Sequence, residues 1–371
     1  MAAVAAALVA ALAHGAAAAR VAHQRGAGSN ASSLATPGWA APEWCEALDK
    51  LPPLAPPPSA VVVPDCAANT LWKGLGITTA DFADALWERA RDPAEIGQGQ
   101  RPDYAFCGPA AFLHVLAMHN PQRYQQLGVG LFCKGVYQAP GTGAARIDVT
   151  RRTILERCGA KGILAEEPLL DTPCGDEPCS GDEALGGDRP ASIHAADWVL
   201  QASLLQHLNF WAPPTRIFRL SHLTTPWGMQ RWLHEFLPEA TVVRHGRLLP
   251  RLSSTVSRRT SPRWEQQWAK DIRGAVQASQ GRAVALLLIR CSCCGTLHWM
   301  VLRAASQSHC YVKTYGQYER RDCEALGRLT LTALVVSLPD VPDGARATLC
   351  GHLMQNLSDA PAKAISDCGD E

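Results

Sequence analysis

The sequence carries almost no net charge and contains no dense run of lysine or arginine. Its 371 residues include 35 Lys or Arg and 34 Asp or Glu, which leaves a formal charge of +1. A surface that binds nucleic acid needs a strong positive field, and this composition does not supply one. The most arginine-rich stretch, residues 251–263, is interpreted as a solvated loop. We therefore expect no nucleic-acid partner.

The N-terminus lacks the features that mark exported and membrane proteins. Residues 1–19 are mostly Ala, Val and Leu, but no basic residue precedes Arg20, whereas a signal peptide begins with a basic region. Gly15 interrupts the run and alanine is only weakly apolar, so we expect no stable membrane insertion. The favoured interpretation is a cytoplasmic protein. The alternative is export, if residues 1–19 act as a weak signal.

The sequence also lacks an internal repeat and a phosphate-binding fingerprint. Its two short Gly-x-Gly sequences, which begin at Gly97 and Gly141, do not stand between a strand and a helix as a nucleotide site requires. We therefore predict no cofactor.

Two regions differ in composition. Residues 1–60 are rich in Ala, Pro, Gly and Ser, and cannot bury enough apolar surface to offset the entropy of ordering. We predict that they form a flexible leader and linker, and that deleting them leaves the fold intact. Residues 61–371 are predicted to form one domain with an insertion at about 160–260.

The 14 cysteines are irregularly spaced and do not indicate a small disulfide scaffold. Reduced thiols are expected, although Cys174 and Cys179 can pair if the protein is exported. Cys291 and Cys294 have the spacing of half a zinc site. A second pair would have to come from elsewhere, for example from Cys174 and Cys179 or from Cys310 and Cys323, at poor spacing.

Apolar periodicity predicts helices in the first half of the domain and antiparallel strands in the second, an α+β fold. The predicted helices cover residues 79–91, 109–119, 122–135, 151–158, 193–208 and 264–280, with one more from Thr225 or Pro226. The predicted strands cover residues 283–289, 297–302, 311–315 and 329–338.

Cys107 opens the segment Cys-Gly-Pro-Ala-Ala-Phe-Leu, which predicts a thiol in the first turn of a buried helix. Free N–H groups and the helix dipole favour an anion at this position. We therefore predict a thiol pKa below the ordinary value of about 8.5. Far downstream, His298 stands in an apolar strand. A cysteine at a helix start and a distant histidine are the outline of a cysteine hydrolase.

The Cys107–Ala111 turn and the pair His298-Trp299, in this order, resemble the papain-like cysteine peptidase fold. The likeness is nearest to bacterial papain-like proteins of the bacteriocin-processing type, and to a second bacterial group that shares this turn. The segment at Asp197-Trp198 resembles the second group less securely. From the residues alone, we expect Asp197 and Trp198 to pack or cap their helix.

The resemblance implies that Cys107 is the nucleophile and His298 the base, with a peptide or protein as substrate. A residue on the next strand would orient the imidazole, and Thr314 stands where the family usually has Asp or Asn. An amide shortly before the cysteine would bind the oxyanion; Gln100 is the candidate, although its spacing is longer than usual.

The expected function is thus a cysteine peptidase or related amide hydrolase that works through a thiolate and an acyl-thioester. Transfer of the acyl group to an amine, as in transglutaminase-like enzymes, uses the same groups. Because Thr314 is a weaker orienter than a carboxylate, a binding protein on an inactive papain-like fold is a rival. A less favoured rival is a zinc-stabilised interaction module using Cys291, Cys294 and His298. The predicted site contains no metal, and the sequence does not predict an oligomeric state.

Overall fold

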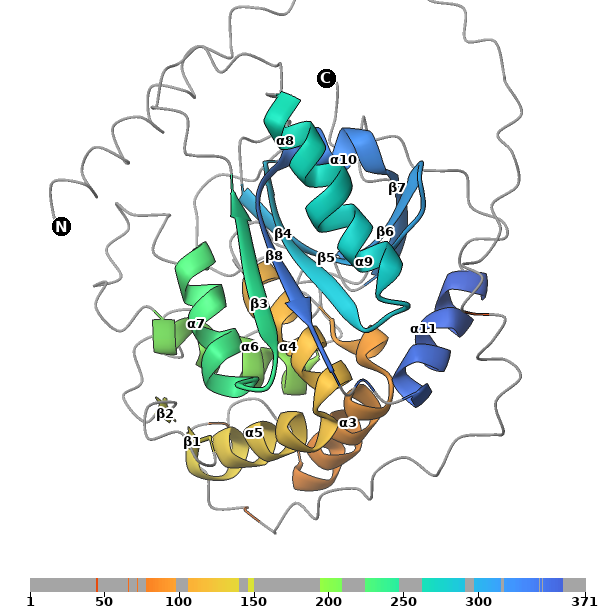
Figure 1. The fold of residues 1–371 in the computed structure, drawn as a ribbon. Coiled ribbons are helices and arrows are strands. Elements are labelled where there is room, and N and C mark those ends of the chain that lie inside the picture. Colours follow the sequence, from red (N-terminus) through yellow and green to blue (C-terminus); the bar gives the residue numbers. More distant parts are fainter. Residues whose placement is uncertain are drawn as a thin grey trace, which may run out of the picture.

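The fold is described from a computed structural model. The residues it describes are 45, 66, 72, 78–97, 106–139, 146–149, 194–208, 224–246, 262–290, 297–314, 317–339, 341 and 343–355. Helices and antiparallel strands are combined in this part of the chain, as the sequence predicts (Figure 1).

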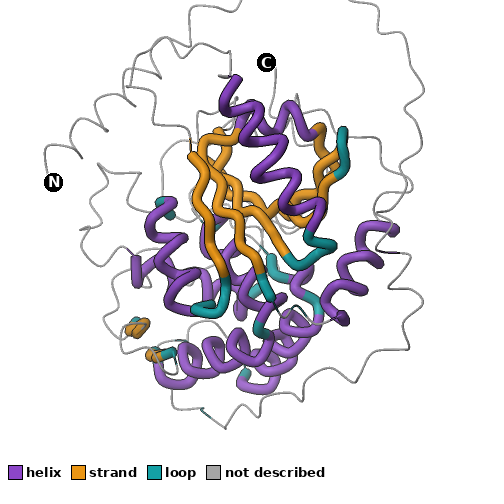
Figure 2. The backbone as a smooth tube through the Cα atoms, in the orientation of Figure 1, coloured by secondary structure: helices purple, strands orange, loops and turns teal. Residues whose placement is uncertain are grey.

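Five helices form a layer on one face of the main sheet (Figures 1 and 2). They are α3 (Thr79–Arg91), α4 (Cys107–His119), α5 (Pro121–Lys134), α6 (Ala195–Leu208) and α7 (Pro226–Phe236). Helix α4 is apolar all round and every one of its residues is buried, so it is the central helix of this layer. A β-hairpin-like pair, β1 (Val136–Gln138) and β2 (Arg146–Asp148), follows α5.

The main sheet has six antiparallel strands in the order β3-β8-β4-β5-β6-β7. Their bounds are β3 (Thr241–Gly246), β4 (Ala283–Arg290), β5 (Leu297–Ala305), β6 (His309–Thr314), β7 (Gln317–Asp322) and β8 (Thr330–Ser337). Strand β4, at the centre, is buried at all but its last residue, which explains its uninterrupted apolar sequence.

The two faces of this sheet belong to different cores, because successive side chains of a strand point to opposite faces. On β5, Trp299 and Val301 pack toward α3–α7, and we call this side the helical face. Met300 and Leu302 pack on the opposite side, the outer face. The outer face is covered by α8 (Pro262–Gln267), the π-helix η5 (Trp268–Arg273), α9 (Gly274–Ala278) and α10 (Cys323–Leu329).

A last helix, α11 (Asp343–Gln355), is joined by a disulfide between Cys350 and Cys45. Further disulfides join Cys66 to Cys133 and Cys310 to Cys323. The expectation of reduced thiols is therefore wrong for these six residues. Cys45 is fully buried although it falls within residues 1–60, so at this point the predicted leader belongs to the folded body.

The helices predicted at 79–91, 109–119, 122–135 and 193–208, the helix predicted from Thr225 or Pro226 and the four predicted strands are present, with ends shifted by a few residues. The helix predicted at 264–280 is observed as α8, η5 and α9 together. The helix predicted at 151–158 lies outside the described residues, as does most of the predicted insertion. Strands β3 and β7 and helices α10 and α11 were not predicted, and their polar or mixed sequences explain why.

Candidate active site

Cys107 is the first residue of α4, as its sequence predicts. No side chain caps this helix, so the N–H groups of its first turn are available to the thiol. Gly108 is needed here because a Cβ atom at this position would overlap the side chain of Thr224. Pro109 fits the first turn, where its missing N–H costs nothing. The local sequence thus starts the helix and lets another segment approach its N-terminus closely.

The Cys107 thiol is buried and accepts main-chain hydrogen bonds. The N–H groups of Cys107 and Gly108 come from its own helix, and the N–H of Trp299 comes from β5. Burial raises the pKa of the thiol above its ordinary value, and these hydrogen bonds offset only part of the rise. The prediction of a lowered pKa is therefore wrong for this state, because it counted the helix terminus and omitted the loss of solvent.

His298 lies near the start of β5 and is bound to Thr314 on β6. The distance between His298 Nε2 and Thr314 Oγ1 is 2.7 Å, and both residues are buried. The register that pairs Val301 with Lys313 places Thr314 diagonally across from His298, on the outer face. The structure thus brings together the predicted base and the predicted orienting residue.

The imidazole of His298 is neutral in this environment. Burial lowers its pKa to about 3, with a further contribution from the positive charge of Arg321. A neutral ring has one protonated nitrogen. When Nε2 carries this proton and donates it to Thr314 Oγ1, Nδ1 is the basic nitrogen of the ring.

The Cys107 thiol and the His298 imidazole lie on opposite faces of the sheet, on either side of the peptide group that joins His298 to Trp299. Helix α4 packs on the helical face, whereas strand alternation places the His298 ring on the outer face. The Cys107 thiol accepts from the N–H of Trp299, which is the peptide group that joins Trp299 to His298. The predicted nucleophile and the predicted base therefore approach β5 from opposite faces of the sheet.

Thr224, which sequence reasoning missed, joins the two elements of the site. Its side chain rests on Gly108, and its carbonyl accepts a 2.7 Å hydrogen bond from the indole Nε1 of Trp299. The next residue, Thr225, caps α7 by accepting from the N–H of Gly228. The Thr-Thr-Pro sequence predicts the cap, but nothing in it indicates the contact with α4 and β5.

A second cluster lies beside the segment that leads to Cys107. Arg89 of α3 forms a two-point ion pair with Asp197 of α6, with both N–O distances 2.8 Å. Asp197 also accepts from the N–H of Gly97, and Gln201 donates to the carbonyl of Gly97. Asp197 was expected only to pack or cap its helix. It also forms an ion pair with Arg89, which no local sequence pattern indicates.

Two predicted features lie outside the described residues: Gln100, and the cysteines at 291–294. Cys310 and Cys323, considered as a second half of a zinc site, form a disulfide and cannot bind zinc in this state. No group of metal-binding side chains occurs among the residues that the structure describes.

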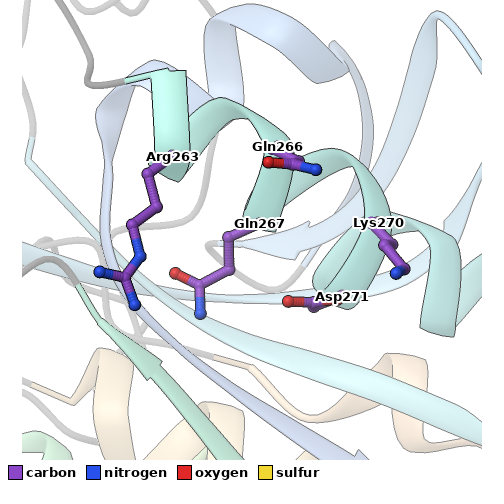
Figure 3. Close-up of a pocket in the computed structure, with 5 residues that line it drawn as sticks. All are labelled: Arg263, Gln266, Gln267, Lys270 and Asp271. Atoms are coloured by element: carbon purple, nitrogen blue, oxygen red, sulfur yellow. The ribbon is translucent and has the colours of Figure 1, made fainter.

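A hollow of about 250 Å³ lies elsewhere, on the helices of the outer face (Figure 3). Its lining is polar and comes entirely from α8 and η5, through Arg263, Gln266, Gln267, Lys270 and Asp271. It contains none of the predicted catalytic residues.

Comparison of the chain with protein-family models, with curated protein sequences and with solved structures finds no match. None of the helices in the described part of the chain has the length and apolar character needed to cross a membrane.

Proposed function

We propose that this chain is a papain-like cysteine hydrolase that cleaves amide bonds of peptides or proteins, with Cys107 as nucleophile and His298 as base. One observation carries the proposal: a thiol at a helix N-terminus is hydrogen-bonded to the peptide N–H that follows a histidine, and this histidine is itself bound to a polar side chain. An inert core cysteine requires none of these features.

The reaction proceeds in two steps. His298 accepts the thiol proton, which must pass from the helical face of β5 to the imidazole on its outer face, and the Cys107 thiolate attacks the carbonyl carbon of the substrate. The oxyanion then collapses, the C–N bond breaks, and the imidazolium returns its proton to the leaving amine. In the second step water attacks the acyl-thioester, with His298 again accepting and returning a proton. An amine in place of water gives acyl transfer.

The main chain and Thr314 supply the remaining parts of this mechanism. The N–H of Cys107 is a donor for the oxyanion, and Gln100 is proposed as a second donor. Thr314 Oγ1 holds the imidazole through Nε2, as an Asp or Asn does in the resembled family. A hydroxyl stabilises the imidazolium less than a carboxylate, so a slow enzyme is expected.

The experiment compares cleavage of fluorescently labelled casein and alkylation by iodoacetamide in four proteins. These are the wild type, Cys107→Ala, His298→Ala and the control His309→Ala, whose histidine lies at the other end of the β5–β6 pair. Cleavage should be abolished in Cys107→Ala, fall about a thousandfold in His298→Ala, and persist in the control. Cleavage that survives in Cys107→Ala would overturn the proposal.

A binding protein on the same fold is the second candidate. It is favoured by the burial that keeps both Cys107 and His298 uncharged. In that case the wild type cleaves nothing, and its thiol reacts no faster than a buried cysteine. Metal analysis of the wild type and of Cys291→Ser tests the third candidate, a zinc-stabilised module. If the protein is a hydrolase, the Cys291→Ser variant should retain most of its activity.

We further propose that the protein functions in an oxidising compartment and is therefore exported. Of the seven cysteines that the structure describes, six are paired and Cys107 alone is free. Such disulfides persist outside the reducing cytosol. Peptide mapping of unreduced, iodoacetamide-treated protein should find three linked pairs and an alkylated Cys107. Alkylation of all seven in protein taken directly from its native cells would contradict export.

A further inference from the structure

Strand β3 forms one edge of the main sheet. It pairs with β8 along its whole length, Thr241–Gly246, and no other strand in the described part of the chain pairs with it. Its residues are exposed or half-buried throughout, whereas the central strand β4 is almost wholly buried. An edge strand presents main-chain N–H and C=O groups to which a further strand can bond. The outward side of β3 is therefore a place where an extended peptide can be added to the sheet.

Two apolar side chains at this edge are exposed. Trp227 of α7 is 61% exposed and Val243 of β3 is 47% exposed, and among the described residues these are the exposed large apolar side chains. Val242 packs toward the helical face, and Arg244 lies on that face too, with its guanidinium 4.3 Å from the centre of the Trp227 ring. Val243, between them, points to the outer face. A strand added beside β3 therefore meets one exposed apolar side chain on each face.

The polar hollow on α8 and η5 adjoins the same strand. Gln267 lines the hollow, and its Nε2 lies 3.1 Å from Nδ1 of His245 on β3. His245 is two residues from Val243 and therefore shares the outer face with it. Figure 3 shows the side chains of Arg263 and Gln267 extending in the same direction from their helix. The hollow thus lies on the face of β3 to which Val243 points.

The charges of β3 and of the hollow favour an acidic partner. The hollow has two cationic side chains, Arg263 and Lys270, and one carboxylate, Asp271. Arg244 adds a third cation on the helical face, and all four residues are exposed. The excess of positive charge attracts a segment that carries carboxylates. It disfavours a second copy of this chain at the same edge, because two copies of β3 would bring their own cations together.

We propose that β3 is the docking site for an extended, acidic segment of a partner protein, which adds to the main sheet as a seventh strand. Main-chain hydrogen bonds to β3 hold the segment, and its apolar side chains cover Val243 and Trp227. Its carboxylates pair with Arg244, Arg263 and Lys270. Strands β8 and β4 separate β3 from β5, which carries the proposed base, so the inference does not depend on the proposed hydrolase function.

The test measures the fluorescence anisotropy of three labelled octapeptides mixed with the full chain. The first alternates valine and glutamate, and the second alternates valine and lysine. The third is the acidic peptide with its main-chain amides N-methylated, which keeps the charge but donates no main-chain hydrogen bond. The acidic peptide should bind, and the other two should bind at least about tenfold more weakly. Equal binding of the acidic and N-methylated peptides would show attraction by charge without strand addition and overturn the inference, as would failure of the acidic peptide to bind.

A charge reversal locates the binding. Arg244→Glu should weaken binding of the acidic peptide about tenfold, because it replaces an attraction by a repulsion. Arg91→Glu is the matched control and should stay within about twofold of wild type. Arg91 is also exposed and also stacks on a tryptophan, with its guanidinium 4.6 Å from the centre of the Trp87 ring, but it belongs to α3. Equal losses in the two variants would show attraction to the whole surface and overturn the inference.

Hydrogen exchange identifies the strand that is covered. Binding of the acidic peptide should slow exchange of the amides in β3 and leave those of β7, the strand at the other edge, unchanged. Unchanged exchange in β3 would place the peptide elsewhere and overturn the inference. Sedimentation of the wild type without peptide tests the other occupant. A dimer in which β3 is already protected would assign this edge to a second copy of the chain, which also overturns the inference.

Discussion

The two faces of the six-stranded sheet use buried polar groups for different purposes. On the helical face these groups bind main chain: Lys313 donates to Ala94, and Asp197 accepts from Gly97. On the outer face, near the proposed site, they act on one ring, because Thr314 binds His298, and burial together with the charge of Arg321 lowers its pKa. The helical face therefore fixes where the chain runs. The outer face sets the protonation state of the proposed base.

This difference separates the expected effects of substitutions. Changes on the helical face should act first on stability, because they leave buried groups of a packed helical layer unpaired. Changes near His298 should act on its chemistry and on its response to pH. The proposed site draws on both faces, since Cys107 lies on the helical side of β5 and the imidazole on the outer side.

The largest effect is expected from breaking the ion pair on the helical face. Arg89→Met leaves the carboxylate of Asp197 buried without its cation, which should lower the free energy of unfolding by about 3–5 kcal/mol. Arg328→Met is the control, because Arg328 pairs with Glu324 at an exposed position and should cost no more than about 1 kcal/mol. Urea unfolding measures both. Equal losses would mean that burial does not increase the contribution of the Arg89–Asp197 pair to the free energy of unfolding.

A disulfide from each side of the sheet provides the next comparison. Cys45–Cys350 spans 305 residues beside α11, and Cys310–Cys323 spans 13 at the outer face. Replacing a pair by two serines should cost about 2–4 kcal/mol, and more for the longer loop because its closure restricts the unfolded chain more. Thermal unfolding of the two double variants compares them. A smaller loss for Cys45→Ser/Cys350→Ser would show that the short loop contributes through packing instead.

The sequence is sufficient for the features that depend on neighbouring residues. Helix α4 follows from an apolar run that begins at Gly108-Pro109, and β5 from the apolar residues after His298. The relation of Thr314 to His298 came from the resemblance and was placed by the register of two adjacent strands. Each of these predictions depended on residues close together in the sequence or on a regular spacing of apolar residues.

Other features depend on residues that are far apart in the chain. Arg89 and Asp197 are separated by 108 residues, and no local pattern in the sequence pairs them. The contact of Thr224 with Gly108 is of the same kind. The raised pKa of the Cys107 thiol depends on how completely the fold excludes solvent, which local sequence does not encode. Strand β7 is polar along most of its length and has no apolar alternation to reveal it.

Thr314→Val should lower activity about tenfold, less than His298→Ala, because the base remains and only its orientation is lost. Valine has the shape of threonine without the hydroxyl that binds Nε2. Thr330→Val is the matched control, since that buried hydroxyl binds the carbonyl of Leu326, away from the site. Casein cleavage and urea unfolding are measured for both variants, so that a loss of activity is distinguished from a loss of stability. Thr314→Asp, if accommodated, should raise activity by restoring a carboxylate partner.

The smallest predicted effect is a change in how stability depends on pH. The pKa of His298 is about 3 in the folded protein, below the unfolded value of about 6.5, so between these limits the unfolded chain binds more protons. The stability that comes from keeping the ring neutral is therefore fully present above about pH 6.5. It is lost as the pH falls toward 3.

His298→Gln removes this titration and should flatten the loss of stability between about pH 6.5 and pH 4. His309→Gln is the control. Burial also lowers the pKa of His309, but its ring is only partly buried. Urea unfolding at a series of pH values gives the three curves. If wild type and His298→Gln lose stability in parallel, the imidazole is not held neutral in the folded protein. The pKa of His298 would then be close to its ordinary value, and the outer face would not keep the base neutral at pH values below it.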